Sequence, residues 1–496
     1  MDTGSNSGYT EAPRGLRGWL FIFILCATQL FAQIALCYII IPLNEVSSTF
    51  GQAGHEHAAE RNWHVAAYSL TIGSFILVTG RLGDIYGAKN IFVIGWIWFG
   101  VWSVICGCSA LTRSVIFFDV SRGFQGIGPA LLLPNALAIA GRTFPPGAKK
   151  NMVFCMIAMC APLGGVIGGL VGSAFAQYVW WPWAMWISGI ACFIMAVMAY
   201  FVVPQPPSME PGNEKITLDW IGSILGVGGL ILLNVSWNQA PIDGWSTPYV
   251  YVLLIIGLLL LVLFYFQEKK ATHPITDTSI FNARVIGVLF TTALGWSSFG
   301  VWFYYMFQFL QQERGVSSLG SAIQFIPGAL SGMVAPIFTA WAIPRMSSSS
   351  LMIVASSAFF VGSLLQALAP VHQSYWFNTF WSFVIMAWGM DVSFPASALF
   401  VSDSVPVEHQ GISASLVNTV INYSIAIGLG IAGTVEVELP TVKTVLDGYK
   451  AAQYTSVGLS GAALILSLVL AIFNGNKAEK YLSGTESEEA QIRNVD

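Results

Sequence analysis

Charge is what this sequence has least of. Only 9% of its 496 residues are Asp, Glu, Lys or Arg, whereas 55% are hydrophobic and the mean hydropathy is +0.67. A water-soluble protein of this length needs far more charge to cover its surface. The composition therefore excludes a soluble globular protein.

Other absences narrow the function further. The net charge of -4 is close to neutral and argues neither for nor against a nucleic-acid partner. No basic block of five or more residues occurs, and we expect no nucleic-acid partner. The seven cysteines all fall in apolar stretches and predict small buried side chains instead of a disulfide framework or a zinc site. The six histidines are scattered, with only His55 and His57 close together. We expect no metal and no cofactor.

What the sequence has in abundance is long apolar blocks. They are roughly 20 residues long, the length that an α-helix needs to cross hydrocarbon. The ten-residue alternating segments of a transmembrane β-barrel are not seen. The sequence thus predicts an all-α polytopic membrane protein with fourteen transmembrane helices, near 19–43, 64–82, 90–111, 114–138, 152–177, 183–204, 218–238, 248–268, 285–309, 320–343, 350–369, 376–401, 411–434 and 454–474.

The distribution of basic residues predicts the orientation in the membrane. With the N-terminus in the cytoplasm, the cytoplasmic segments hold 15 of the 21 Lys and Arg residues and the opposite segments hold 5. Cytoplasmic loops carry such an excess, so we expect both ends in the cytoplasm. The aromatic run "YVWWPW" (178–183) falls at the opposite interface, where indole rings prefer to lie.

Three charges and three glycines are concentrated in the short connector "GRLGDIYGAKN" (80–90) after the second span. Gly80 and Gly87 allow a tight turn, and Asp84 is placed to accept from a neighbouring helix N-terminus or to pair with Arg81. With Lys89, such a cluster would hold two helix bundles together in one state and release them in another. The alternative is a solvated loop that only obeys the positive-inside rule.

Arg122, in "FFDVSRGFQGIGPA" (117–130), lies within a span. A cation there costs several kcal/mol unless it is paired or faces a cavity. Asp119 precedes it by three residues, about one helical turn, so the two side chains are placed to neutralise each other. The alternative is that Arg122 tunes a nearby acid during cycles of protonation.

A second acid, Asp391 in "MAWGMDVSFPASALF" (386–400), also lies inside a span. Such a residue is a functional-site hypothesis by default, and reversible protonation would be its natural role. The alternative is a structural acid capped by Ser393 or by a partner on the next span, such as Asn418 or Asn422.

Glycines dominate the fifth span in "APLGGVIGGLVG" (161–172). Overlapping pairs four residues apart make a smooth face on which another helix can pack closely and slide. Tight packing without transport explains the same pattern. The candidate residues of this packing motif are Pro162, Gly164, Gly165, Gly168 and Gly169.

Polar and aromatic side chains in mid-membrane positions are candidates for a substrate cavity, although each single residue also suits helix packing. Those on spans 1, 4 and 9 are Gln29, Gln33, Gln125, Trp302, Tyr304, Tyr305 and Gln308.

Three of these stretches resemble motifs of the major facilitator superfamily. "GRLGDIYGAKN" is similar to its signature loop, G-x-L-[AG]-D-x-x-G-R-[KR], except that Ala88 replaces a basic residue. "RGFQGIG" resembles the helix 4 motif R-x-x-Q-G-x-[GA], in which the arginine is tied to proton transfer. "APLGGVIGGLVG" resembles the antiporter motif G-x-x-x-G-P-x-x-G-G, but Gly165 stands where proline is usual. The resemblance implies a cytoplasmic gate at Arg81, Asp84 and Lys89.

A more particular resemblance comes from "VPVEHQGISASLVNTVINYSIAIGLGIAGTVE" (405–436), together with "DVSFPA", "LDWIGSILGVGGLILL" (218–233) and "LQQERGVSSLGSAIQFIPGAL" (310–330). These stretches look like the fungal aminotriazole-resistance branch of the fourteen-span drug:proton antiporters. The branch implies two six-helix bundles that enclose a midplane site, plus two inserted helices. The implied segments are a cytoplasmic tail (1–18), the first bundle (19–204), the linker and inserted pair (205–284), the second bundle (285–474) and a cytoplasmic tail (475–496).

The function that follows is proton-coupled export of a toxic small molecule by a monomer, most naturally in the plasma membrane, with the vacuolar membrane as the alternative. A proton-coupled importer remains open because the helix 5 motif is imperfect, and the branch is also linked to small inorganic solutes such as borate. A membrane enzyme would need a His/Asp or metal-type cluster that the sequence does not suggest. A non-transporting sensor would be expected to carry a longer cytoplasmic tail than the one seen here.

Overall fold

The computed structural model describes residues 13–52, 57–145, 148–204, 217–272, 274–276, 280–403, 410–439 and 444–493. Much of the Pro-rich connector between spans 6 and 7, together with His55, His273 and His409, lies outside the described residues.

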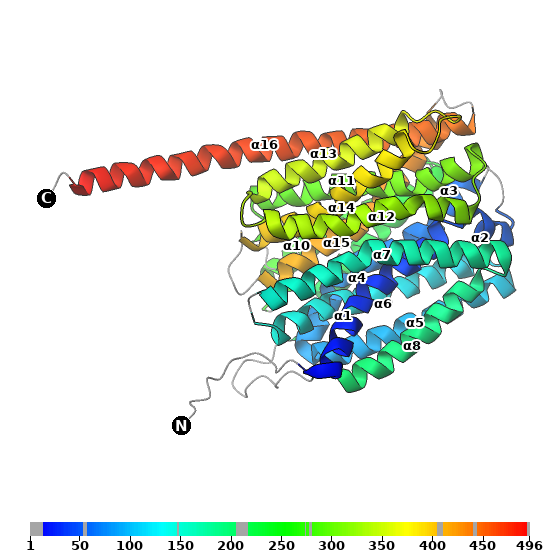
Figure 1. The fold of residues 1–496 in the computed structure, drawn as a ribbon, viewed down its shortest axis with the longest axis horizontal. Helices are drawn as coiled ribbons and strands as arrows, with labels where there is room; N and C mark the ends of the chain where they lie inside the picture. Colours follow the sequence, from blue (N-terminus) through cyan, green and yellow to red (C-terminus); the bar gives the residue numbers. More distant parts are fainter. Residues whose placement is uncertain are drawn as a thin grey trace.

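The described residues form helices joined by short connections (Figure 1). Fourteen helices are long and apolar enough to cross a membrane, so the predicted number of spans is confirmed. The elements in chain order are α1 (Gly15–Ile40), α2 (Leu43–Thr49), α3 (Ala58–Arg61), α4 (Trp63–Tyr86), α5 (Ala88–Thr112), α6 (Val115–Thr143), α7 (Ala148–Tyr178), α8 (Pro182–Val202), α9 (Trp220–Asp243), α10 (Pro248–Lys270), α11 (Ala283–Gln308), the π-helical turn η3 (Phe309–Glu313), α12 (Ser318–Ala342), α13 (Ser348–Ala367), α14 (Asn378–Asp403), α15 (Gln410–Glu438) and α16 (Val445–Arg493).

Helix ends follow from local chemistry. The side-chain oxygens of Ser114, Asp219 and Asn282 accept from backbone N–H groups in the first turns of α6, α9 and α11. These bonds satisfy donors that a helix N-terminus otherwise leaves open. Gly87 ends α4 with φ 93°, a conformation that side chains disfavour, and so permits the sharp turn into α5.

The spans group into two bundles. In the first, α1 packs on α7, α4 on α6, and α5 on both α6 and α8; in the second, α11 packs on α15 and α16, α12 on α14, and α13 on α14 and α16. The bundles meet where α4 packs on α15 and α7 packs on α12. The largest contacts between the bundles are therefore two helix pairs, each with one helix from either bundle.

Helices α9 and α10 pack on each other, and α9 also contacts α4 and α15. The Asn238 amide donates to the Ala426 carbonyl at 3.2 Å, and the Tyr423 hydroxyl donates to the Leu230 carbonyl at 2.9 Å. On the other side, the Trp63 indole donates to Gln239 at 3.1 Å. The pair thus lies beside one of the two bundle contacts. The domain boundaries expected at 204 and 284 stay a prediction.

The two ends of the helical assembly differ. Helix α1 begins, and α16 runs out of the assembly, at one end, which we call the terminal end; α2 and α3 lie at the other, which we call the distal end (Figure 1). An even number of spans requires this arrangement.

Candidate functional site

Arg122 is fully buried in the middle of the first bundle. Its Nε donates to the His64 carbonyl at 3.1 Å, and its Nη1 donates to the Ala35 carbonyl at 2.9 Å. The guanidinium also lies over the Tyr68 ring, 4.4 Å from its centroid, whereas Nη2 has no hydrogen-bond partner in the described part of the chain. Neutral groups of α1 and α4 therefore solvate this charge, and one donor is left unused.

Gln125 completes the surroundings of Arg122. Its Oε1 accepts from Arg122 Nη1 at 2.6 Å, and its Nε2 donates to the Tyr38 hydroxyl at 2.6 Å and to Ser103 at 2.8 Å. The side chain is fully buried. Gln125 was expected in a substrate cavity; the structure instead places it in a closed network that joins α1, α5 and α6, because every polar atom of its amide finds a partner there.

Asp119 does not pair with Arg122 as the three-residue spacing suggested. Its Oδ1 lies 2.6 Å from Nδ1 of His64, which begins the adjacent helix α4. Helical spacing placed the two side chains of α6 on related faces, but the neighbouring helix offers the acid a nearer partner. The mutual-neutralisation prediction is therefore wrong, and Arg122 keeps its charge without a bonded carboxylate.

Asp391 lies where the two bundles meet. A Cβ on Gly332 of α12 would be 2.7 Å from Asp391 Oδ2 and 3.2 Å from Pro162 of α7, so these three residues converge. Oδ2 is buried and has no hydrogen-bond partner among the described residues. The expected cap by Ser393 is not formed, because that hydroxyl donates to the Met390 carbonyl at 3.1 Å and accepts from Trp296.

The glycine motif of α7 has two faces with different neighbours. A Cβ on Gly164, Gly168 or Gly172 would come within 2.6 Å of the α1 backbone at Leu30, Ile34 or Tyr38. A Cβ on Gly165 or Gly169 would instead meet side chains. From Gly165 these are Phe325 of α12 in the other bundle at 3.3 Å and Cys37 of α1 at 3.5 Å, and from Gly169 they are Ile41 at the end of α1 and, at 3.6 Å, Ala322 of α12. One face thus fixes α7 within its own bundle, and the other contributes to the contact between bundles.

We expect Gly168→Ala to destabilise the protein by about 1–3 kcal/mol, because its methyl group would overlap the Ile34 backbone, which cannot rotate away. Gly165→Ala is the matched control and should cost less than about 1 kcal/mol, since the aromatic ring of Phe325 can shift. Thermal unfolding of both purified variants in detergent measures the difference. Equal melting temperatures would contradict the assignment of the two faces.

The charged connector of the terminal end lies between α4, α5 and α6. Asp84 accepts from Arg142 Nη2 at 2.7 Å, and both side chains are a little over one third exposed. Arg142, near the end of α6, therefore takes the place of Arg81, which was one of the two partners expected for Asp84. Gly80 lies inside α4 and not in the expected turn, which is made by Gly87. A Cβ on Gly80 would lie 3.5 Å from Pro134 of α6 and 3.5 Å from Ser415 of α15, so this part of α4 also faces the second bundle.

The other two bases of the connector have separate surroundings. Arg81 is half-buried, and its Nε has no hydrogen-bond partner within the described ranges. Lys89 Nζ lies over the Tyr200 ring of α8, 5.7 Å from its centroid. Their predicted part in a gate stays a prediction.

The cavity candidates divide into two groups. Gln29 and Gln33 of α1 are half-buried, and Gln33 lies close to Gly164 of α7. Trp302 differs from expectation: it is buried inside the second bundle, where its indole donates to Ser382 at 2.8 Å and its ring packs on Phe383. Hydrophobic burial, together with one polar partner, explains that position without a ligand.

Tyr304, Tyr305 and Gln308 lie near the distal end. The Tyr305 hydroxyl donates to Glu436 of α15 at 2.5 Å, and the Tyr304 and Tyr305 rings lie 5.0 Å apart. Gln308 accepts from Gln312 at 2.7 Å. All three are buried, so they contribute to the closure of this end.

A polar network joins the two bundles at the distal end. Asn44, which belongs to α2, accepts from Arg61 and from Gln312 at 2.8 Å each, and donates to Gln311 at 3.0 Å. Gln311 also donates to the Ile41 carbonyl at 2.6 Å. We define the distal polar network by the residues Asn44, Arg61, Gln308, Gln311, Gln312 and Tyr449, whose hydroxyl donates to Gln312 at 2.7 Å. It connects the two bundles at the distal end.

Sequence reasoning missed four charged or titratable residues: His64, Arg142, Arg61 and Glu436. His64 and Arg61 stand at the polar entrance of the second span, a signal that marked a helix start. Arg142 and Glu436 lie at predicted span ends, where charges are ordinary. Only the packing of distant segments shows that these four residues differ from the ordinary charges at the ends of spans.

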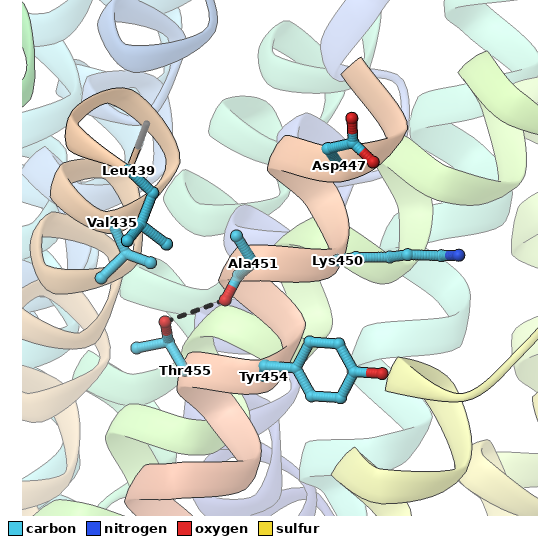
Figure 2. Close-up of a pocket in the computed structure, with 7 residues that line it drawn as sticks. All are labelled: Val435, Leu439, Asp447, Lys450, Ala451, Tyr454 and Thr455. Atoms are coloured by element: carbon cyan, nitrogen blue, oxygen red, sulfur yellow. Dashed lines mark hydrogen bonds between the residues drawn. The ribbon is translucent and has the colours of Figure 1, made fainter. Parts of the chain in front are cut away.

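A surface depression of about 550 Å³ lies where α15 ends and α16 begins (Figure 2). Its lining residues are Val435, Leu439, Asp447, Lys450, Ala451, Tyr454 and Thr455. Asp447 and Lys450 point away from Val435 and Leu439 (Figure 2). Because all of them belong to the second bundle, this depression is separate from the contact between the bundles.

Comparison with known proteins identifies relatives along nearly the whole chain. The family model described as Major Facilitator Superfamily matches residues 21–429. A "Major facilitator superfamily multidrug transporter mdr3" of Aspergillus fumigatus is 54% identical, over 94% of this chain and 82% of the relative. Two proteins of Saccharomyces cerevisiae also match: a "Low affinity ammonium transporter" (46% identical; 95% and 92% covered) and an "Aminotriazole resistance protein" (38% identical; 93% and 85% covered).

Among solved structures, the "POT family transporter PepTSo" superposes with a TM-score of 0.66 at 14% identity, covering 94% of this chain and 99% of that one. At this identity the likeness concerns the fold alone. It confirms the predicted two-bundle fold class.

Proposed function

The chain belongs to the Major Facilitator Superfamily, and we propose that it is a proton-coupled exporter of small toxic organic molecules that works by alternating access. The multidrug and aminotriazole-resistance names of its relatives support export. Its resemblance to the fungal aminotriazole-resistance branch, inferred from the sequence, agrees with these relatives. The observation that carries the coupling is the carboxylate of Asp391, which lies between the bundles without a partner for one oxygen.

Asp391 suits a proton carrier for an electrostatic reason. An ionised carboxylate in a low-dielectric interface is unfavourable unless it is paired, whereas a protonated one carries no charge. Its oxygen faces Gly332 of α12, and Gly332 in turn lies against Pro162 of α7. The packing of α12 on α7 is one of the two main helix contacts between the bundles. Protonation there would change the interaction energy of the moving surfaces themselves.

Arg122 supplies the second element of coupling. Its fixed charge is solvated by carbonyl groups of α1 and α4 and leaves Nη2 without a partner. Such a charge is ready to bind an anionic group or to bias a nearby acid towards its ionised form. Asp119 is the nearest acid along the same helix, so we place it in the coupling machinery together with Arg122 and Asp391.

Alternating access requires contacts that break at each end in turn. At the distal end the contact is the distal polar network. At the terminal end it is the contact of Gly80 with α15, and the bond between Asp84 and Arg142 holds α4 to α6 beside it within the first bundle. Between them, the half-buried amides of Gln29 and Gln33 are our candidates for substrate contact.

We place both ends of the chain in the cytoplasm because of the threefold excess of basic residues on that side. The terminal end is then cytoplasmic and the distal end faces outside. A monomer in the plasma membrane is the simplest arrangement, since each chain contains both bundles.

A second candidate function is transport of a small inorganic solute, which the ammonium transporter among the relatives favours. The two candidates differ in substrate size and in direction. Expression in a yeast strain that lacks its own exporters, grown on 3-aminotriazole, ethidium, borate and ammonium, separates them. Resistance with reduced cellular accumulation supports export, and greater accumulation of ammonium or borate reverses the direction.

Coupling is tested with the purified chain in liposomes. Substrate accumulation should follow an imposed proton gradient and collapse when a protonophore dissipates it. Transport that ignores the gradient would contradict the proposed coupling while leaving the export assignment intact.

The pair between Asp84 and Arg142 predicts a charge-reversal result. Asp84→Arg or Arg142→Asp alone should lower transport about fivefold, since an ion pair as exposed as this one is worth no more than about 1 kcal/mol. The double variant should recover most of the loss because it restores an opposite pair. Export assays on membranes with matched protein levels measure all three, and a double variant as poor as the worse single one would refute pairing as the basis of the effect.

A further inference from the structure

His64 and Asp119 form a buried pair near the distal end of the first bundle. His64 is the second residue of α4, Asp119 is the fifth residue of α6, and Nδ1 lies 2.6 Å from Oδ1. The His64 side chain is 0% exposed and that of Asp119 is 19% exposed. Only the acid therefore reaches the surface, and a proton arriving at the pair meets Asp119 first.

The second ring nitrogen of His64 has no polar neighbour. Nε2 is buried without a hydrogen-bond partner in the described ranges. The ring lies edge-on to Phe118, 5.0 Å between centroids, and 6.0 Å from Phe50, which in turn packs on Trp181. An imidazole in this setting fits the neutral tautomer, in which Nδ1–H donates to the carboxylate and Nε2 carries a lone pair.

The charged groups around the pair come mainly from α6. Arg122 donates to the His64 carbonyl, and Asp119 binds the ring. Tyr68 of α4 lies beneath Arg122, Tyr38 of α1 is joined to it through Gln125, and Cys106 of α5 is within electrostatic reach of both Asp119 and Arg122. With neutral His64, the charges of Asp119 and Arg122 cancel.

Protonation would disturb this balance in two ways. A proton on Nε2 would become a buried donor without an acceptor, which costs the desolvation of that group. It would also leave one positive charge uncompensated close to Arg122 in a medium of low dielectric constant. Both penalties disappear when water reaches the pair, because water accepts from Nε2–H and screens the charge.

We propose that His64 and Asp119 form a proton-binding site entered from the distal end, and that its protonation favours the conformation in which this end is open. The inference rests on the proposed proton coupling and adds the residue that senses protons on the outer side. His64 is a positioning residue in this scheme, because it does not touch the substrate. Its protonation changes the conformation, and it is linked to Arg122 through its carbonyl group.

The test measures the conformation directly and needs no substrate. Nitroxide labels at exposed distal positions of the two bundles, Leu111 of α5 and Leu368 directly after α13, report opening as a longer distance in double electron–electron resonance. The native cysteines are replaced by alanine, and this background is first checked for export. We expect the fraction of long distances to rise at least about twofold between pH 7.5 and 5.5, as a small shift in a two-state equilibrium requires.

The response should vanish in His64→Gln, which keeps a polar side chain but binds no proton. His57→Gln is the matched control, because His57 lies 3.0 Å from Glu60 at the same end but is one third exposed. It should respond to pH as the wild type does. Asp119→Asn provides a second variant if His64→Gln does not fold, and it should also lose the response.

An unchanged pH response in His64→Gln or Asp119→Asn would overturn the inference and leave the pair as a clamp between α4 and α6. Failure of the proposed function appears separately, as wild-type transport that ignores an imposed proton gradient. A wild-type distance distribution that is the same at both pH values also overturns the inference, whatever the transport result.

Discussion

Replacing Arg122 by alanine should lower export by about two orders of magnitude, which corresponds to ~3 kcal/mol in the rate-limiting step. The side chain joins three helices through the carbonyls of Ala35 and His64 and the amide of Gln125. Alanine removes both the buried charge and these donors. The measurement is resistance of the exporter-deficient strain, with transport in liposomes as the direct assay.

Arg122→Lys separates charge from geometry. Lysine keeps the positive charge but has three donors on a single nitrogen, so it cannot reproduce the planar guanidinium contacts. We expect Arg122→Lys to recover part of the activity. Lysine supplies the positive charge that coupling needs, but it cannot make all the hydrogen bonds of the guanidinium group to Ala35, His64 and Gln125. Retention of wild-type export in Arg122→Ala, at equal protein level, would contradict a coupling role.

Asp391→Asn should abolish gradient-driven accumulation, again by about two orders of magnitude. Asparagine has nearly the same shape as the protonated acid but cannot release a proton. Because Oδ2 of Asp391 accepts no hydrogen bond in the described structure, the substitution breaks no contact there, and the folded protein should persist. The interface with Gly332 and Pro162 would then stay permanently in its neutral form.

Exchange of substrate across liposomes without a gradient is the informative control for this variant. It should continue in Asp391→Asn, since the bundles still move when no proton has to be released. Asp243→Asn, an acid at the end of α9 that is bound by Gln239 and Tyr249, tests the effect of the same chemical change elsewhere and should behave as wild type. Normal accumulation in Asp391→Asn would move the proton-carrying role to another acid.

Much of the fold was predictable from the sequence because the membrane imposes it. A bilayer requires apolar blocks of fixed length and satisfied backbone groups, so each span can be found without knowledge of its neighbours. The fourteen predicted spans correspond to α1, α4 to α12 including η3, and α13 to α16. The family also followed from short motifs whose residues are close together in the chain.

The candidate site was less predictable, because its contacts join distant segments. Helical spacing makes Arg122, the nearest base on the same helix, one possible partner of Asp119, yet His64, 55 residues away, is its partner. Asp84 was expected to bind a neighbouring helix N-terminus or Arg81, and the structure pairs it with Arg142, 58 residues further on. Helical spacing states which residues share a face but not which helix covers that face.

The glycine motif of α7 shows the same division. Its spacing by itself determined that a helix would approach closely, since only small residues permit that contact. The tertiary structure decided that Gly164 and Gly168 pack against the α1 backbone of the same bundle, whereas Gly165 and Gly169 face side chains that include those of α12 in the other bundle. The sequence alone thus determined the spans, the buried charges and the surfaces of close approach, because each depends on neighbouring residues or on the bilayer. Only the packed structure decided the partners, because the arrangement of helices around one another depends on all their faces at once.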